Sequence, residues 1–450
     1  MSLLGISFSG FALWQHLPWA VFAFCLGASV GSFLNVVIYR MPNGMSLRYP
    51  PSRCPICGGR LRFFRENLPI LGWLILRGRC RMCRAKISPV YALVELGMAC
   101  LFLGLYIVFF WVSYRDPWWG TVAGQWWDIQ QFIRAWPAWV CMAFFVAALY
   151  AMTVIDARTF TIPIQIPVFI TVTAFILWPI QGLLARAPVW MDTQLWPIPG
   201  VNWTWCLVAL FGLLGVGVSC FLLWTGRIRY SFEDYGDYVE EGQTLGEYPH
   251  ARREMILELV FLIPIIMGVT LGAVLGGYVT DVATAPPAPW LQALGGSILG
   301  YLVGCGLVWG VRILGTLGFG REAMGMGDVH LLGCIGAVMG WFDPILVFFI
   351  APFIGLAWTL IAWLASALGS RRRELPYGPH LALAALLVLL ARPLVVEGWD
   401  RLLPQVPMPQ RALIQDASGS EAEGLGIDRM STFRRAQLDS RRMSGFNIGG

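Results

Sequence analysis

The sequence predicts an all-α polytopic membrane protein of about 8–10 transmembrane helices with a small zinc-bound cytoplasmic cysteine domain. Three observations predict this class. The chain is 57% hydrophobic and 13% charged, whereas a soluble domain is about one quarter charged. Apolar runs long enough to cross a bilayer recur along most of the chain. Four cysteines in two C-x2-C pairs interrupt this pattern near the N-terminus.

Each apolar run is predicted to be helical, because a helix satisfies its own backbone hydrogen bonds inside the lipid. The first Arg is Arg40, so the first run lacks the basic start of a typical signal peptide. The run at 329–342 is the shortest. The candidate spans are 17–39, 89–112, 136–155, 163–185, 203–224, 255–280, 293–315, 329–342, 344–368 and 380–397.

Basic residues are concentrated in one loop. Residues 40–88 hold eleven Lys and Arg against one acid, Glu66, which predicts a cytoplasmic location by the positive-inside rule. Alternating spans then place the other basic loops on the same side and both termini outside. Orientation and contact with membrane lipid headgroups explain this charge, so no nucleic-acid partner is expected.

The four paired cysteines predict a structural zinc site in this loop. Cys54 and Cys57 are separated by 22 residues from Cys80 and Cys83, a spacing similar to that of four-thiolate zinc sites. Four thiolates fill the coordination sphere of zinc and leave no open position for catalysis. A domain this small needs a bound metal to stabilise its fold. The alternative redox role lacks a surrounding βαβ pattern. The other seven cysteines are expected to pack as small hydrophobes in spans: Cys25, Cys100, Cys141, Cys206, Cys220, Cys305 and Cys334.

Two acids at the ends of spans are the candidate catalytic residues. Asp156 ends the third span and Asp328 begins the eighth, both at the predicted cytoplasmic face. A carboxylate at membrane depth is costly and indicates function. Two that meet share one proton and can act as general base and general acid. The alternative is that both are ordinary helix-boundary acids, with Asp328 a helix cap. Gly325 and Gly327 would let the backbone bend or pack closely before Asp328.

Two further acids fall within predicted spans. Glu95 lies inside the second span, where the alternative to a functional role is a polar contact between helices. Glu258 lies near the start of its span and is expected at the membrane interface.

These motifs together resemble the type IV prepilin peptidase family, the membrane aspartyl proteases with a GxGD motif. The resemblance covers about half of the chain, in the family's order. It is carried by GSFLNVVIYRMP (31–42), SRCPIC (52–57), NLPILGWLILRGRCRMC (67–83), ISPVYALVEL (87–96), Asp156 with Ile162-Pro163, EAMGMGDVHLL (322–332) and LPYGPHLALAA (375–385).

The resemblance implies a bifunctional enzyme of the bacterial cytoplasmic (inner) membrane, with Asp156 and Asp328 as the proteolytic pair. It would cut the leader from type IV prepilin or pseudopilin precursors at the cytoplasmic face. It would then N-methylate the new N-terminal residue with S-adenosylmethionine. The cysteine domain would belong to methylation, and Glu95, in a family-like stretch, is a candidate for that step. The alternatives are a peptidase without methylation, a non-catalytic scaffold for pilus or secretion assembly, and a transporter.

The chain departs from the family pattern in three places. His330 stands where the family commonly has Lys, and Ile164 where it often has an acid. His330 is still expected to support the active site as a polar neighbour. The third departure is length, since 171 residues separate Asp156 from Asp328. The excess is predicted to be two extra spans and a polar cytoplasmic insert at 225–254, either a docking or regulatory segment or a solvated connector.

The predicted domain organisation follows from these assignments. A first transmembrane helix leads into the cysteine domain, a helical protease domain carries the insert, and a polar disordered tail ends the chain. Their boundaries are 1–40, 41–88, 89–397 and 398–450.

Overall fold

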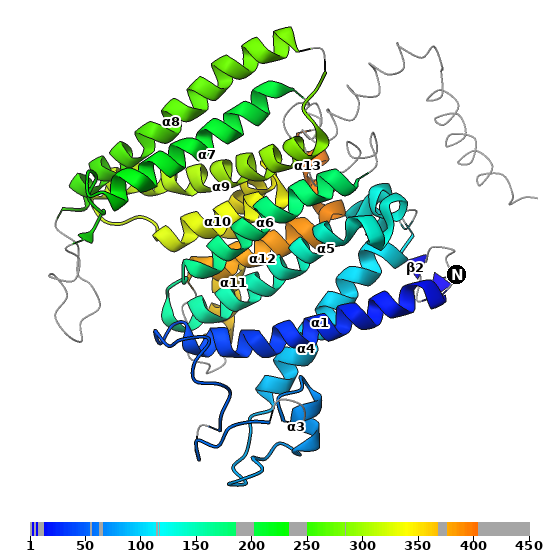
Figure 1. Cartoon of the computed structure of the whole chain (residues 1–450). Coiled ribbons are helices and arrows are strands. Elements are labelled where there is room, and N and C mark those ends of the chain that lie inside the picture. The colour runs from blue at the N-terminus through cyan, green and yellow to red at the C-terminus, as the bar shows by residue number, and fades with distance from the viewer. Residues whose placement is uncertain are drawn as a thin grey trace, which may run out of the picture. The chain divides into compact units, whose positions relative to one another are not determined.

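A computed structural model describes most of the chain, and its helices confirm the predicted fold class (Figure 1). The chain divides into two units, 1–398 and 399–450, and only 399–403 are described in the second. Most of the predicted tail and residues 234–249 of the insert lie outside the described residues. Those described are 2–3, 6–7, 13–54, 56–62, 66–113, 116, 118–185, 202–233, 250–283, 285–367 and 376–403.

Helices make up most of the described structure, with one pair of two-residue strands, β1 (Ser2–Leu3) and β2 (Ile6–Ser7). The helices are α1 (Leu13–Arg40), α3 (Leu71–Ile75), α4 (Val90–Tyr106) with the π-helical η1 (Ile107–Trp111), α5 (Trp119–Thr159), α6 (Gln165–Leu184), α7 (Trp203–Trp224), α8 (Ala251–Val282), α9 (Pro289–Phe319), α10 (Met326–Met339), α11 (Asp343–Ala367), α12 (Tyr377–Leu390) and α13 (Arg392–Leu402).

Eight helices in the described part of the chain are long and apolar enough to cross a membrane, which fits a multi-pass membrane protein. The run at 329–342 forms the 14-residue α10, too short to meet that test. The last predicted span is broken, because α12 and α13 meet at a 91° bend. The predicted range of about 8–10 spans therefore holds at its lower end.

Helix α5 begins well before the predicted span at 136–155. Its first turns pack on η1, where Trp127 stacks on Phe109 with ring centroids 4.4 Å apart. Trp126 and Trp127 are both buried. The aromatic segment between the predicted spans 89–112 and 136–155 is thus partly helical, and neighbouring aromatic rings cover it.

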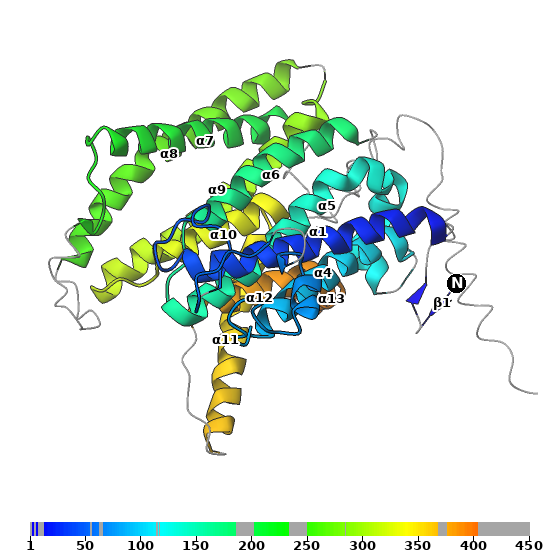
Figure 2. The ribbon, with the colours of Figure 1, turned by 60° about the horizontal axis from the view of Figure 1, so that its bottom comes forward.

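Glycines allow two helix pairs to approach closely. A Cβ on Gly300 of α9 would collide with the backbone of Gly336 on α10, and one on Gly304 would collide with Leu332. The α7–α8 pair is built in the same way, and both views show the two helices side by side (Figures 1 and 2). Its glycines that meet backbone of the facing helix are Gly215, Gly268, Gly272 and Gly276. Small residues at the contact are typical of membrane helices.

Contacts along the helices show which ends meet. Near the start of α1, Trp19 packs on Phe132 of α5 with centroids 4.7 Å apart, and Figure 1 shows that the two helices run in the same direction. Their C-terminal ends, Arg40 and Thr159, therefore lie at one end of the bundle, which we call the site end. The cysteine domain begins directly after Arg40 and continues into α4 (Figure 1).

Candidate active site and metal centre

Asp156 lies in the last turn of α5 and is 4% exposed. The helix stops four residues later, where Phe160 adopts a left-handed conformation (φ 54°) and its N–H donates to the Asp156 carbonyl at 2.8 Å. The buried neighbour Ile155 anchors this turn in the core. The carboxylate is thus held at the site end by a regular helix terminus.

Asp328 lies in the first turn of α10, at the same end. Its N–H donates to the Gly325 carbonyl at 3.2 Å. Gly327 faces the loop after α5, and a Cβ there would lie 3.0 Å from the Ile162 Cβ. Asp328 also lies within Coulombic range of Asp156. The two predicted acids, distant in sequence, are therefore brought to one place by α5 and α10.

Gly378 is a site residue that sequence analysis did not single out. Its backbone N–H faces the Asp156 carboxylate, and a Cβ at this position would collide with that carboxylate. The adjacent Tyr377 lies within Coulombic range of Asp328. The signal was present in the LPYGPH motif, where a glycine at the start of α12 allows the backbone to reach an acid.

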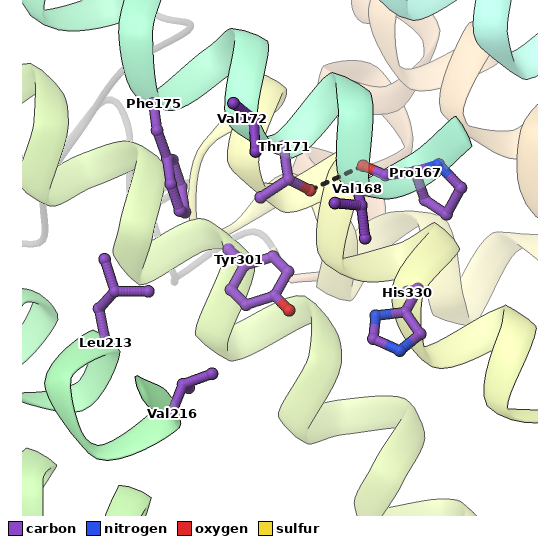
Figure 3. A pocket seen from close by; sticks show the side chains of 9 residues that line it. All are labelled: Pro167, Val168, Thr171, Val172, Phe175, Leu213, Val216, Tyr301 and His330. Atoms are coloured by element: carbon purple, nitrogen blue, oxygen red, sulfur yellow. Dashed lines mark hydrogen bonds between the residues drawn. The ribbon is translucent and has the colours of Figure 1, made fainter. Parts of the chain in front are cut away.

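His330, the third residue predicted to support the aspartates, does not face them. Residues two apart on a helix point about 200° apart, so His330 is directed away from Asp328. It lines a cavity of about 110 Å³ between α6, α7, α9 and α10, together with Tyr301 and Phe175 (Figure 3). Its Nδ1 is buried without a hydrogen-bond partner in the described structure. The predicted support of the aspartates by His330 stays a prediction.

The cysteine domain holds two knuckles of the same design. In the first, the Cys54 N–H donates to the Gly59 carbonyl at 2.9 Å, and in the second, the Cys80 N–H donates to the Ala85 carbonyl at 2.8 Å. Gly58 and Arg84 occupy equivalent positions with positive φ. All four cysteine sulfurs lie within 4.8 Å of one another. This cluster could hold one metal ion, as the spacing of the cysteines predicts.

Backbone groups in the knuckles favour ionised sulfurs. The N–H groups of Cys57 and Ile56 lower the pKa of Cys54 to about 6, and the knuckle N–H groups likewise lower the pKa of Cys80. The Ala85 N–H lowers the pKa of Cys83, but desolvation and the neighbouring thiols outweigh it and raise that pKa to about 11. Four adjacent thiols cannot all ionise alone. A bound cation would favour the fully ionised cluster.

Glu95 joins the cysteine domain to the membrane helices. Its carboxylate accepts the Ile70 N–H at 2.6 Å, where Ile70 precedes the short helix α3 with a φ of 64°. One turn earlier on α4, the Tyr91 carbonyl accepts a hydrogen bond from the Asn35 amide of α1 at 3.2 Å, which joins these two helices. The half-buried Glu95 therefore makes a polar contact, but with the loop rather than with another span.

A multi-pass helical membrane protein with two acids at one end and a four-cysteine cluster is the class that fold and site define. Two family profiles match the chain: the bacterial Peptidase A24 N-terminal domain at residues 25–109 and the type IV leader peptidase family at residues 253–360. Residues 253–360 therefore carry the type IV leader peptidase domain, preceded by the bacterial Peptidase A24 N-terminal domain. The first match contains the four cysteines and Glu95, the second contains Asp328, and Asp156 lies between them.

Curated relatives agree with this assignment. A "Prepilin leader peptidase/N-methyltransferase" of Aeromonas hydrophila is 26% identical over 400 residues, 83% of this chain and 92% of the relative. One of Dickeya chrysanthemi with the same name is 26% identical over 85% of this chain and 95% of the relative. One of Myxococcus xanthus is 53% identical over 98 residues, 22% of this chain and 29% of the relative. No solved structure matches the chain.

Proposed function

We propose that this chain is a prepilin leader peptidase of the bacterial inner membrane that also N-methylates its product. Type IV prepilins or pseudopilins are its substrates, and cleavage takes place at the cytoplasmic face. The names of relatives that align over most of the chain support this proposal. The basic loop at 40–88 supports the orientation through the positive-inside rule.

One observation carries the protease assignment. The end of α5, the start of α10 and the start of α12 are far apart in sequence. They nevertheless converge on two carboxylates at one end of the bundle. Asp156 is buried among them. An ordinary helix-boundary acid needs no such convergence, whereas an acid–base pair does.

In the proposed mechanism, Asp156 and Asp328 share one proton. The ionised carboxylate removes a proton from water as its oxygen attacks the scissile carbonyl carbon. The protonated carboxyl then donates its proton to the departing amine as the C–N bond breaks. The Gly378 N–H, which faces Asp156, helps to hold that carboxylate in place.

The metal in the cysteine cluster is assigned as zinc. Four sulfurs at Zn–S bonds of about 2.3 Å form a tetrahedron with edges of about 3.8 Å. The Sγ–Sγ distances of 3.7 Å for Cys54–Cys83 and 3.9 Å for Cys57–Cys80 fit this shape. Because the four thiolates would fill every position of a bound zinc ion, the ion would hold the domain folded rather than act in catalysis.

The methylation step rests on the names of the relatives. Bound S-adenosylmethionine supplies an electrophilic methyl group, and the amine released by cleavage is its acceptor. Glu95 already accepts the Ile70 N–H, so the role its geometry supports is to hold the cysteine domain against α4. We assign no side chain to the donor itself.

The test is mass spectrometry of a co-expressed prepilin from the same genome. Wild type is compared with Asp328→Asn and with the control Asp281→Asn. Asp281 is an exposed acid near the C-terminal end of α8. We expect wild type and the control to yield a product that lacks its leader and carries one methyl group. Asp328→Asn should leave the precursor intact. An unmethylated product would favour a peptidase alone. Cleavage by Asp328→Asn would remove Asp328 from the catalytic pair, and an uncut precursor with folded wild type would favour a scaffold.

A further inference from the structure

Arg312 of α9 is a buried charge that the proposed mechanism does not use. Its side chain is 2% exposed, and it lies within a span that sequence analysis treated as apolar. A guanidinium is buried at high cost unless its donors are satisfied. Its contacts therefore indicate what the residue is for.

The two sides of the Arg312 guanidinium bind different parts of the chain. Nε donates to Glu258 of α8, at 3.0 Å to Oε1 and 3.2 Å to Oε2. Nη1 donates to the Glu322 carboxylate and to the Met324 carbonyl. Arg312 thus joins α8 to the segment 320–325, which leads directly into Gly325-Met326-Gly327-Asp328.

Other contacts hold the same segment. The buried Thr316 hydroxyl, one turn after Arg312, accepts the Ala323 N–H at 3.1 Å. The Arg252 guanidinium of α8 donates to the carbonyls of Leu317 and Gly318 at 3.0 and 3.3 Å. Arg252 of α8 thus holds the end of α9, and Thr316 of α9 holds the loop that follows it.

Glu258 is itself fixed in orientation. It is 3% exposed, and its Oε2 accepts the Trp309 indole N–H at 2.8 Å. Helix α8 begins at Ala251, so Glu258 lies two turns inside it and is buried against α9; its expected position at the membrane interface stays a prediction. The start of the polar insert reaches the same cluster, with the Phe232 ring 5.3 Å from the Arg312 guanidinium carbon.

We propose, resting on the proposed peptidase function, that Arg312 is a positioning residue that sets the segment 320–325 and through it Asp328. The α7–α8 hairpin and the insert act on the site through the same guanidinium. Helix α10 begins at Met326, so a loop released three residues earlier changes where its first turn lies. Displacement of a reacting group by about 1 Å can cost about 10²-fold in rate.

The principal test is the double variant Arg312→Met with Glu258→Gln, which leaves no unpaired buried charge. We expect kcat for prepilin cleavage to fall about 10²-fold with little change in KM. N-methylation of a synthetic peptide that already has the mature N-terminus should be retained. Arg312→Lys should restore the melting temperature more than kcat, because an ammonium lacks the planar fork that reaches both partners.

A second variant covers the case in which the double variant does not fold. Glu322 is 36% exposed, so Glu322→Gln weakens the hold on the loop at little cost to folding. Its kcat should fall about tenfold. The matched control is Arg392→Met with Asp343→Asn. It removes the buried ion pair of 2.7 Å between α13 and α11 at the opposite end of the bundle, and should cleave like wild type per folded molecule.

The possible outcomes separate the two proposals. Two results would overturn the role of Arg312 and leave the proposed function standing. In the first, the wild-type enzyme cleaves prepilin and Glu322→Gln has the same kcat. In the second, the folded variants lose cleavage and methylation equally. A wild type that is folded but cleaves no prepilin would overturn the proposed function and this inference together.

Discussion

The cysteine domain and the aspartate site are ordered by opposite means. Between residues 41 and 88, the described part of the cysteine domain buries only Cys54, Gly72 and Cys80. In α10, which carries Asp328, ten of 14 residues are buried. A small domain with so little core is expected to need the proposed metal, whereas the aspartates depend on packing of the whole bundle. The two regions should therefore fail independently, and each prediction below tests that separation.

The largest expected effect is that of Asp156→Asn. Cleavage of a purified prepilin should fall by about 10³-fold or more, because an amide can serve neither as general base nor as general acid. Methylation of a peptide with a mature N-terminus should persist. Both rates can be measured by mass spectrometry in one preparation. Cleavage within tenfold of wild type would remove Asp156 from the catalytic pair.

Gly378→Ala should also impair the aspartate site and leave the cysteine domain unchanged. The new methyl group would collide with the Asp156 carboxylate and approach Ile162 to 3.0 Å, so we expect cleavage to fall about 10²-fold with the fold intact. The control is Gly306→Ala in α9, where a Cβ would meet nothing within 4 Å. Equal activity of the two variants would contradict the close packing at Gly378.

Metal removal should produce the reverse pattern. Cys80→Ser, or treatment with a chelator, should abolish methylation while cleavage falls less than tenfold, since the aspartates do not depend on the cluster. Limited proteolysis should then cut within 41–88. Cys100→Ser, at an exposed cysteine of α4, serves as the control. A parallel collapse of both activities would show that the two regions are one unit.

The smallest effect is expected at the link between α4 and the cysteine domain. Glu95→Ala removes the acceptor of the Ile70 N–H, a charge-assisted bond worth about 1.5–3 kcal/mol. Hydrogen exchange at residues 67–75 should become at least tenfold faster, and methylation should fall a few-fold. Unchanged exchange in this segment would mean that Glu95 does not hold the domain.

Physical reasons explain which features of the fold and the site the sequence predicts and which it does not. Apolar length predicts spans because lipid imposes one rule on every helix, and the C-x2-C pairs predict a cluster because sulfur spacing is local. The approach of Gly378 to Asp156 is a contact between distant segments, so the LPYGPH motif shows a glycine at a helix start but not which acid it meets.

Two site features could have been read from the sequence. An Arg within an apolar run is functional by default, which indicates Arg312. Spacing alone shows that His330 faces away from Asp328, because residues two apart on a helix point in nearly opposite directions.

The α7–α8 hairpin has a consequence for how the chain can lengthen. Its two helices meet through their own glycines and return the chain to the side from which it left. An even number of added crossings leaves every later helix with its original orientation, whereas a single one would invert them all. The distance in sequence between Asp156 and Asp328 can therefore grow in pairs of helices without moving either acid to the other face of the membrane.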